Sequence, residues 1–211
     1  MGPKIRSLLL AVLALAATVL IAVTPFWLPQ VALAATTALI MGGAGHPLST
    51  PPDKLGFVNQ YTDNRLTNYV NQSGFTGSPG TPPDNTVVVI TPEARILGFG
   101  FDPAFTFRGI FDGPFDKAVA TGTQNLDNCI KGAADCAYNQ PASTGAPDPN
   151  SQFIVYGYSQ SSSVATMEKI ALMERYRYPG NVDINGNPSP DVSFVLTANG
   201  NRPNGGILTR G

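Results

Sequence analysis

The sequence predicts an α/β domain built on a doubly wound, mostly parallel sheet. Three observations support this fold class. Short apolar runs alternate along the chain with longer segments whose apolar residues recur at helical spacing. The apolar runs are continuous, as in strands that are buried on both faces. The 211 residues, 43% of them hydrophobic, are enough for one domain with a real core.

The composition excludes some classes of protein. Charged residues make up only 13% of the chain and the formal net charge is −1, without any basic block. An electrostatic nucleic-acid binder is therefore not expected. One histidine and two cysteines are too few for a Cys/His zinc site, so we expect no metal.

Residues 1–34 have the pattern of a secretory signal peptide. Lys4 and Arg6 precede an apolar run over 8–23, and Ala32-Leu33-Ala34 provides a small-residue cleavage site. An uncleaved N-terminal anchor is the alternative, because the apolar run is long, and it would associate the protein with the membrane or cell envelope. We expect a secreted or cell-envelope protein whose folded domain covers residues 35–211.

Two buried strands are predicted in the first half of the domain. Residues 38–41 are apolar and end at a glycine pair, and residues 86–91 contain three valines and an isoleucine. Between them, a helix is expected to begin at Asp53, which would serve as its N-cap. Five residues of this segment recur at roughly helical spacing: Leu55, Val58, Leu66, Tyr69 and Val70.

The second half repeats the alternation. A helix is predicted over 115–130, because Phe115, Val119, Gly122, Leu126 and Cys129 share one face. Strands are predicted at 152–156 and 192–196, and the helix between them should end near Arg177. Asn185-Gly186 indicates a tight turn. The aromatic stretch 93–113 fits no single pattern.

The segment with chemical content is Gly157-Tyr158-Ser159-Gln160-Ser161, which lies between an apolar strand and a predicted helix. In a nucleophile elbow, a sharp turn of this kind exposes the serine hydroxyl above the sheet. Small residues two positions on either side keep the strand and the helix apart. The alternative is a strand end followed by a polar helix cap. We take Ser159 as the candidate nucleophile and the Gln160 N–H as an oxyanion donor.

A glycine-rich loop follows the first predicted strand, and its residues Gly43, Ala44 and Gly45 precede His46. In a serine hydrolase, one backbone N–H of such a loop completes the oxyanion hole. A plain turn that needs glycine explains the same residues equally well.

Cys129 and Cys136 would form a disulfide in an oxidising compartment. Closing a ring of about eight residues would stabilise the fold by roughly 2–3 kcal/mol. Two unpaired, small core residues are the alternative.

Several motifs in the same order resemble the PE-PPE domain of mycobacteria. They are Met41-Gly42-Gly43-Ala44-Gly45-His46-Pro47, Gln60-Tyr61-Thr62-Asp63-Asn64, Asn125-Leu126-Asp127, Gly157-Tyr158-Ser159-Gln160-Ser161 and Asn201-Arg202-Pro203-Asn204-Gly205-Gly206. The resemblance covers roughly residues 38–211. It implies an α/β-hydrolase fold similar to cutinases, a serine esterase or lipase acting on acyl esters or lipid esters, and no cofactor. It also implies export or attachment to the cell envelope.

The sequence departs from this family in its triad. The resemblance implies that the acid and the base follow Asn201–Gly206, yet no histidine follows Ser159. Asp183 lies beside a turn and Asp191 begins a strand, so neither is at the usual position of a triad acid. His46 precedes the nucleophile and is the alternative base, since triads are defined by geometry.

We therefore expect a hydrolase domain that is incomplete at its C-terminus and has little activity alone. The main alternative is a non-catalytic exported binding or envelope protein that keeps the fold. A degraded fragment without a stable product is the third.

Overall fold

The computed structural model describes residues 34–92 and 115–200. The predicted signal segment, apart from Ala34, and the ambiguous stretch 93–113 lie outside these residues. In the described part, no helix has the length and apolar character needed to cross a membrane. The same residues contain no cluster of three or more His, Cys, Asp or Glu side chains able to hold a metal ion.

Within residues 34–92 and 115–200, four parallel strands form one sheet. They are β1 (Thr36–Met41), β2 (Asn85–Val89), β3 (Gln152–Tyr158) and β4 (Val192–Thr197), in the spatial order β2-β1-β3-β4. Every pair of neighbours is parallel, with Leu39 opposite both Val87 and Val155. The predicted parallel α/β fold is therefore confirmed.

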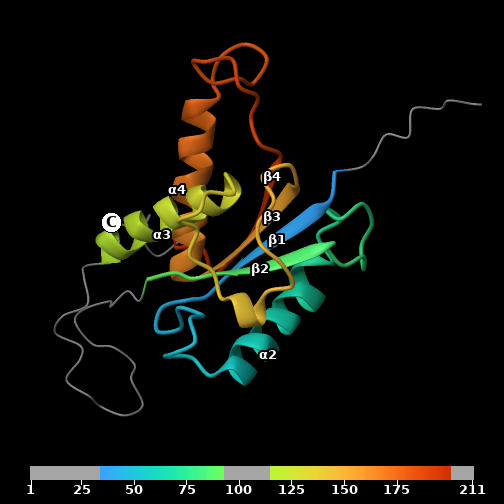
Figure 1. Ribbon diagram of the computed structural model, residues 1–211, viewed down its shortest axis with the longest axis vertical. Helices are drawn as coiled ribbons and strands as arrows, with labels where there is room; N and C mark the ends of the chain where they lie inside the picture. Colours follow the sequence, from blue (N-terminus) through green and yellow to red (C-terminus); the bar gives the residue numbers. More distant parts are fainter. Residues whose placement is uncertain (1–33, 93–114, 201–211) are drawn as a thin grey trace, which may run out of the picture. The chain divides into compact units, whose positions relative to one another are not determined.

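Helices cover both faces of the sheet (Figure 1). Helix α2 (Leu55–Arg65), continued by a π-helical turn over Leu66–Val70, lies on one face. Helices α3 (Phe115–Ile130) and α4 (Gln160–Arg175) pack against each other on the opposite face. A short 3-10 helix, Gln140–Ala142, lies in the loop between α3 and β3. The sheet is thus doubly wound.

The alternation of side chains along β1 explains this layering. Leu39 and Met41 face α3 and α4, in one cluster with Leu126 and Val164. Ala38 and Ile40 face the other way, and their cluster includes Val70, Ile154 and Tyr156. These four residues of β1 are fully buried, which is why this part of the strand has a continuous apolar sequence.

Several boundaries differ from the sequence prediction by one or two residues, and those of β2 and α2 have a clear physical reason. Strand β2 ends at Val89, because the N–H of Ile90 donates to the carbonyl of Ala137 and the N–H of Thr91 donates to that of Pro47. Helix α2 begins at Leu55, with Lys54 as its N-cap, so the expectation that Asp53 caps it is wrong. The Asp53 carboxylate instead accepts hydrogen bonds from the preceding loop.

The strand order contains one topological switch point. The chain leaves β1 toward β2 on one side, whereas β3 lies on the other side of β1. In open parallel sheets, ligands bind outside the carboxyl ends of the strands at such a point. The loops after β1 and β3, which hold Gly43 and Ser159, both lie there.

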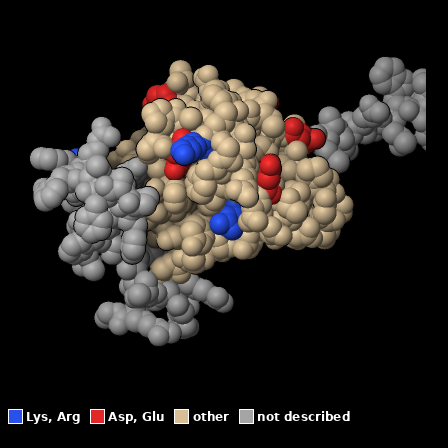
Figure 2. Space-filling view, turned by 90° about the horizontal axis from the view of Figure 1, so that it is seen from below, with Lys and Arg blue, Asp and Glu red and all other residues tan. Residues whose placement is uncertain are grey.

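Charged side chains are sparse on the face shown in Figure 2, where basic residues do not gather into a patch.

Candidate functional site at the sheet switch point

Ser159 occupies a strained turn between β3 and α4. Its backbone has φ 55° and ψ −114°, a conformation that costs a non-glycine residue of order 1–3 kcal/mol. Strand β3 ends at the preceding residue and helix α4 begins at the following one. This is the strand–serine–helix geometry that a nucleophile elbow requires.

The residues around Ser159 hold the turn. The Ser161 hydroxyl accepts a hydrogen bond from the Tyr158 N–H at 2.8 Å, and the Ser162 N–H donates to the Ser159 carbonyl at 3.1 Å. A Cβ added to Gly157 would lie 2.7 Å from the Ser161 carbonyl oxygen and 2.9 Å from the Ser162 Cα. The closeness of this backbone explains why a residue without a side chain stands two positions before the serine.

The glycine loop after β1 lies against this turn. A Cβ built on Gly43 would be 3.6 Å from the Ser159 Cβ and 2.9 Å from a ring carbon of Tyr158. At Gly42, an added Cβ would lie 2.0 Å from the His46 carbonyl oxygen. The loop therefore needs glycine at 42 and 43 for close approach, and it brings the Gly43 backbone next to Ser159.

Gln160 is the first residue of α4 and is buried. Backbone N–H groups in the first turn of a helix have no partner within the helix, and the helix dipole favours negative charge there. The Gln160 side chain points elsewhere, because its Nε2 donates to the Pro92 carbonyl at 2.9 Å. What Gln160 offers to the site is thus its backbone N–H.

His46 is paired with a carboxylate. Its Nδ1 lies 2.9 Å from the Asp53 Oδ1, and the Asp53 Oδ2 accepts the Leu48 N–H at 2.9 Å. Asp53 is buried, while the His46 side chain is 54% exposed. The His46 ring lies beside the Phe57 ring, tilted by 35°, with the ring centroids 4.6 Å apart. No hydrogen bond joins His46 to Ser159 in the described structure.

Sequence reasoning did not find the role of Asp53. An aspartate just before an apolar helical pattern is typical of an N-cap, and this pattern concealed its pairing with a histidine seven residues earlier. The signal available in the sequence was the short His46–Asp53 spacing around a proline-rich turn.

Asp183 and Asp191 lie away from this site. The Asp183 carboxylate accepts the N–H groups of Asn185 and Asn187 inside the predicted turn. The Asp191 carbonyl accepts a hydrogen bond from the N–H of Phe153 at the beginning of β3, whereas Ser159 follows the other end of this strand. Neither carboxylate is placed to act with the serine.

Cys129 and Cys136 are joined by a disulfide, with Cα atoms 4.7 Å apart. The Cys129 side chain is fully buried in the core that α3 and α4 share. The bond closes the loop that follows α3, on the same side of the sheet as α4.

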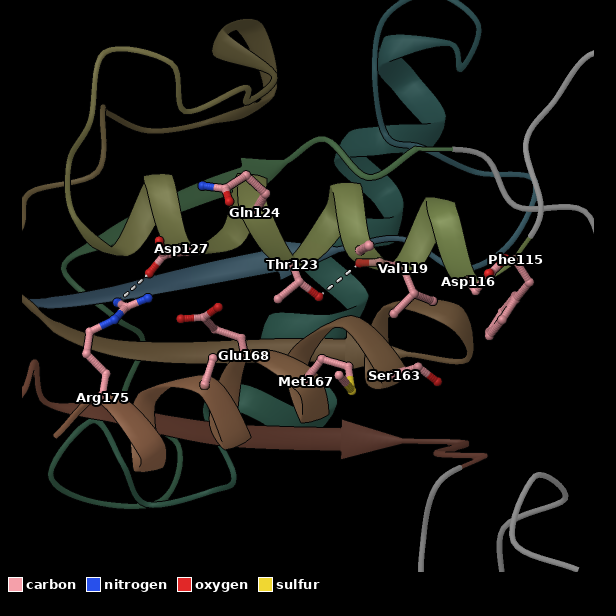
Figure 3. Close-up of a pocket in the computed structure, with 12 residues that line it drawn as sticks. Phe115, Asp116, Val119, Thr123, Gln124, Asp127, Ser163, Met167, Glu168 and Arg175 are labelled. Atoms are coloured by element: carbon pink, nitrogen blue, oxygen red, sulfur yellow. Dashed lines mark hydrogen bonds and ion pairs between the residues drawn. The ribbon is translucent and has the colours of Figure 1, made fainter. Parts of the chain in front are cut away.

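A groove of about 520 Å³ lies between α3 and α4 (Figure 3). Phe115, Val119 and Met167 form part of its apolar wall, and Ser163 lies one helical turn beyond Ser159. At the other end, Asp127 is paired with Arg175 at 2.8 Å, close to the buried Glu168. Burial and the neighbouring Asp127 charge raise the pKa of Glu168 to about 8.

Fold and site together define an α/β protein with a strained serine at the switch point of a parallel sheet. The model of the family described as the PE-PPE domain matches residues 82–211, and the chain belongs to this family.

Three relatives come from Mycobacterium tuberculosis. The chain is 34% identical to Esterase PE16 (strain ATCC 25618 / H37Rv) over 148 residues, which are 65% of this chain and 24% of that protein. It is 36% identical to the uncharacterized PPE family protein PPE42 (strain CDC 1551 / Oshkosh) over 50% of this chain and 15% of the relative. It is 29% identical to the PE family protein PE3 (strain ATCC 25618 / H37Rv) over 82% of this chain and 28% of the relative.

The chain thus matches between 15% and 28% of the length of these relatives. No solved structure matches it.

Proposed function

We propose that this chain is a serine-hydrolase domain that acts on acyl esters, with Ser159 as the nucleophile. The observation that carries the proposal is the strained Ser159 turn packed against the Gly43 loop. The relative that is named an esterase supports the same class of reaction. Cutinase-like hydrolysis of acyl or lipid esters needs no cofactor.

In this mechanism, the Ser159 hydroxyl attacks the ester carbonyl and the carbonyl oxygen becomes an oxyanion. The N–H of Gln160, at the start of α4, and one N–H from Gly43, Ala44 or Gly45 would donate to that oxyanion. Both donors are backbone groups on elements that are fixed before the substrate binds. Such preorganised donors contribute about 2.7–4 kcal/mol each in known serine hydrolases.

A serine hydroxyl also needs a base that takes its proton. The 211 residues contain one histidine, His46, whose Nδ1 faces Asp53. We propose that His46 does not serve as this base and that the 211 residues alone hydrolyse esters slowly. The oxyanion donors and binding would leave about 10³–10⁴-fold acceleration over water.

The test compares the wild type with Ser159→Ala and His46→Ala on 4-nitrophenyl butyrate, together with fluorophosphonate labelling. We expect turnover at or below the detection limit in all three proteins, because His46 does not act as the base, and fluorophosphonate labelling that Ser159→Ala abolishes and His46→Ala leaves unchanged. Robust turnover that both substitutions abolish would make His46 the base. Labelling that survives Ser159→Ala would overturn the assignment of the nucleophile.

The single histidine also favours a second candidate, a non-catalytic binding protein of the cell envelope that keeps the hydrolase fold. Absence of both turnover and fluorophosphonate labelling in a folded wild type would support this candidate.

We further propose that the protein is secreted or held at the cell envelope, with residues 1–34 as a signal peptide or membrane anchor. The basic and apolar pattern of this segment supports the proposal. N-terminal sequencing of the exported protein tests it, since cleavage should leave Ala35 as the first residue.

A further inference from the structure

An arginine beside the Ser159 turn is surrounded by tyrosines. The Arg65 Cζ lies 4.6 Å from the ring centroid of Tyr61, 5.3 Å from that of Tyr158, 5.7 Å from that of Tyr69 and 6.0 Å from that of Tyr156. Cation–π attraction operates over these distances. The four rings come from α2, its π-helical continuation and the end of β3, so the cluster joins separate elements.

The charge of Arg65 is not neutralised within the described part of the chain. No described carboxylate lies within 4.0 Å of its guanidinium. Two other cations, Lys131 and Arg175, are by contrast both paired with the carboxylate of Asp127. The Arg65 Nε is buried and has no hydrogen-bond partner. One terminal nitrogen makes a long bond, 3.3 Å, to the Asn64 side chain.

The tyrosines do not supply the missing negative charge. Burial, followed by the nearby Tyr156, raises the pKa of Tyr61, so its phenol stays protonated at neutral pH. Burial also raises the pKa of Tyr156. The Tyr61 hydroxyl donates a hydrogen bond to the Met41 carbonyl oxygen at 3.1 Å. Arg65 is therefore a cation in a neutral, aromatic environment.

The cluster is continuous with the candidate active site. Tyr158 immediately precedes Ser159. A Cβ added to Gly43 would lie 2.9 and 3.1 Å from two ring carbons of Tyr158, so this ring packs directly on the Gly43 backbone. The same ring packs near the Arg65 guanidinium, and 38% of Tyr158 is exposed. Arg65 therefore lies one aromatic ring away from the Gly43 loop.

A guanidinium is planar and weakly hydrated, and it binds carboxylate or phosphate through two parallel hydrogen bonds. Stacking on tyrosine faces orients such a group while its donors remain in the plane. We propose that Arg65 forms a subsite for an anionic oxyacid group, carboxylate or phosphate, on the ester that Ser159 attacks. This proposal rests on the proposed esterase function and names its substrate class.

Binding tests the subsite without requiring turnover. Amide chemical shifts of the 211-residue chain are followed during titration with monomethyl glutarate and with its neutral match, dimethyl glutarate. A phosphate arm uses 1-butyryl-glycerol 3-phosphate against 1-butyryl-glycerol. The variants are Arg65→Met, Arg65→Lys and the control Arg177→Met. Arg177 is exposed, and its Cζ lies 5.7 Å from the Tyr178 ring, so the control removes a similar arginine–tyrosine pair elsewhere.

We expect the wild type to bind at least one anionic probe about tenfold more tightly than its neutral match, as one charge-assisted contact would give. Shifts should include Gly43 and Tyr158. Arg65→Met should remove the preference, Arg65→Lys should retain part of it, and Arg177→Met should leave it unchanged. The more tightly bound probe identifies carboxylate or phosphate as the preferred group.

Equal affinity of the wild type for charged and neutral probes would overturn the proposal, whether or not Arg65→Met folds. So would an anionic preference that persists in a folded Arg65→Met protein. The esterase proposal fails separately: it requires turnover or fluorophosphonate labelling that depends on Ser159, and the probe titrations require neither. A kinetic arm with the mono-4-nitrophenyl ester of glutaric acid and its methyl ester should show the Arg65 effect in KM.

Discussion

The carboxylate of Asp53 holds His46 at 2.9 Å through Nδ1 and, with its other oxygen, accepts the N–H of Leu48 at the same distance. One buried side chain thus fixes both ends of the turn that follows Gly43 and Gly45. The backbone N–H of His46 also donates a hydrogen bond to the Gly43 carbonyl oxygen at 3.1 Å. The position of the glycine loop beside Ser159 therefore depends on Asp53.

Replacing Asp53 should loosen this loop. Asp53→Ala removes both acceptors and leaves the buried Leu48 N–H unpaired, so we expect the free energy of unfolding to fall by about 1–3 kcal/mol. Urea denaturation measures the change. Asp63→Ala, at an exposed position of α2, is the control and should change stability by less than about 0.5 kcal/mol. Equal effects of the two substitutions would show that the Asp53 contacts contribute nothing specific.

The disulfide should contribute to stability because it closes a short loop in the unfolded chain. We expect the double variant Cys129→Ala, Cys136→Ala to unfold at lower urea concentration, with a loss of about 2–3 kcal/mol. A thiol titration of the non-reduced, unfolded wild type should find no free thiol. Two reactive thiols would contradict the pairing.

Most of the fold was predictable because the local and long-range signals agree. The run Ala38–Met41 is apolar throughout, which fits only an element buried on both faces, and the structure places it in the centre of the sheet. The α3 boundaries match the prediction, since Val119, Gly122 and Leu126 recur on one face that packs on the sheet.

The α2 segment was harder to predict. Its apolar residues recur at roughly helical spacing, yet Tyr69 is about one-third exposed. The π-helical turn over Leu66–Val70, closed by the Asn71 N–H bonded to the Leu66 carbonyl, changes the angular phase of the residues within it. A 3.6-residue periodicity does not contain this information.

The residues of the candidate site also fall into two groups, those that the sequence predicts and those that only the structure brings together. Ser159 and the Gly43 loop carry local signals, a sharp turn and glycines, that can be read from neighbouring residues. The pairing of His46 with Asp53, and the position of Arg65 among tyrosines of three elements, are tertiary contacts. No local pattern distinguishes that arginine from an exposed one on α2.

The Ser159 turn should depend on the absence of a side chain at 157. Gly157→Ala places a Cβ 2.7 Å from the Ser161 carbonyl oxygen, and this backbone atom cannot rotate away. We expect a loss of about 1–3 kcal/mol in stability, as for other overpacked sites, and weaker fluorophosphonate labelling of Ser159. Gly56→Ala is the control, because nothing lies within 4 Å of its added Cβ and alanine favours the α2 helix. Its stability should remain the same or rise by up to about 1 kcal/mol. An undisturbed Gly157→Ala protein would show that the turn can relax.

Glu168 should make the fold weaker as the pH rises. It is buried between α3 and α4, and its Oε1 has no hydrogen-bond partner (Figure 3). Burial, then the charge of Asp127, raises its pKa from 4.5 to about 8, while Arg175 and Lys131 oppose the rise. The pKa of Asp127 itself is lowered: its burial is outweighed by hydrogen bonds from Arg175 and Lys131, so it stays ionised throughout this range. The folded protein therefore keeps the Glu168 proton after the unfolded chain has lost it.

The free energy of unfolding should consequently fall as the pH rises from about 4.5 toward 8 and then level off. Glu168→Gln removes this loss, because glutamine stays neutral at every pH. Relative to the wild type, the variant should gain stability at pH 8.5 compared with pH 5, as measured by urea denaturation at both values. Glu174→Gln, at an exposed position of the same helix, should show no such gain. A difference between Glu168→Gln and wild type that is independent of pH would mean that the Glu168 carboxyl ionises in the folded state as readily as in the unfolded chain, and that the α3–α4 groove accepts its charge.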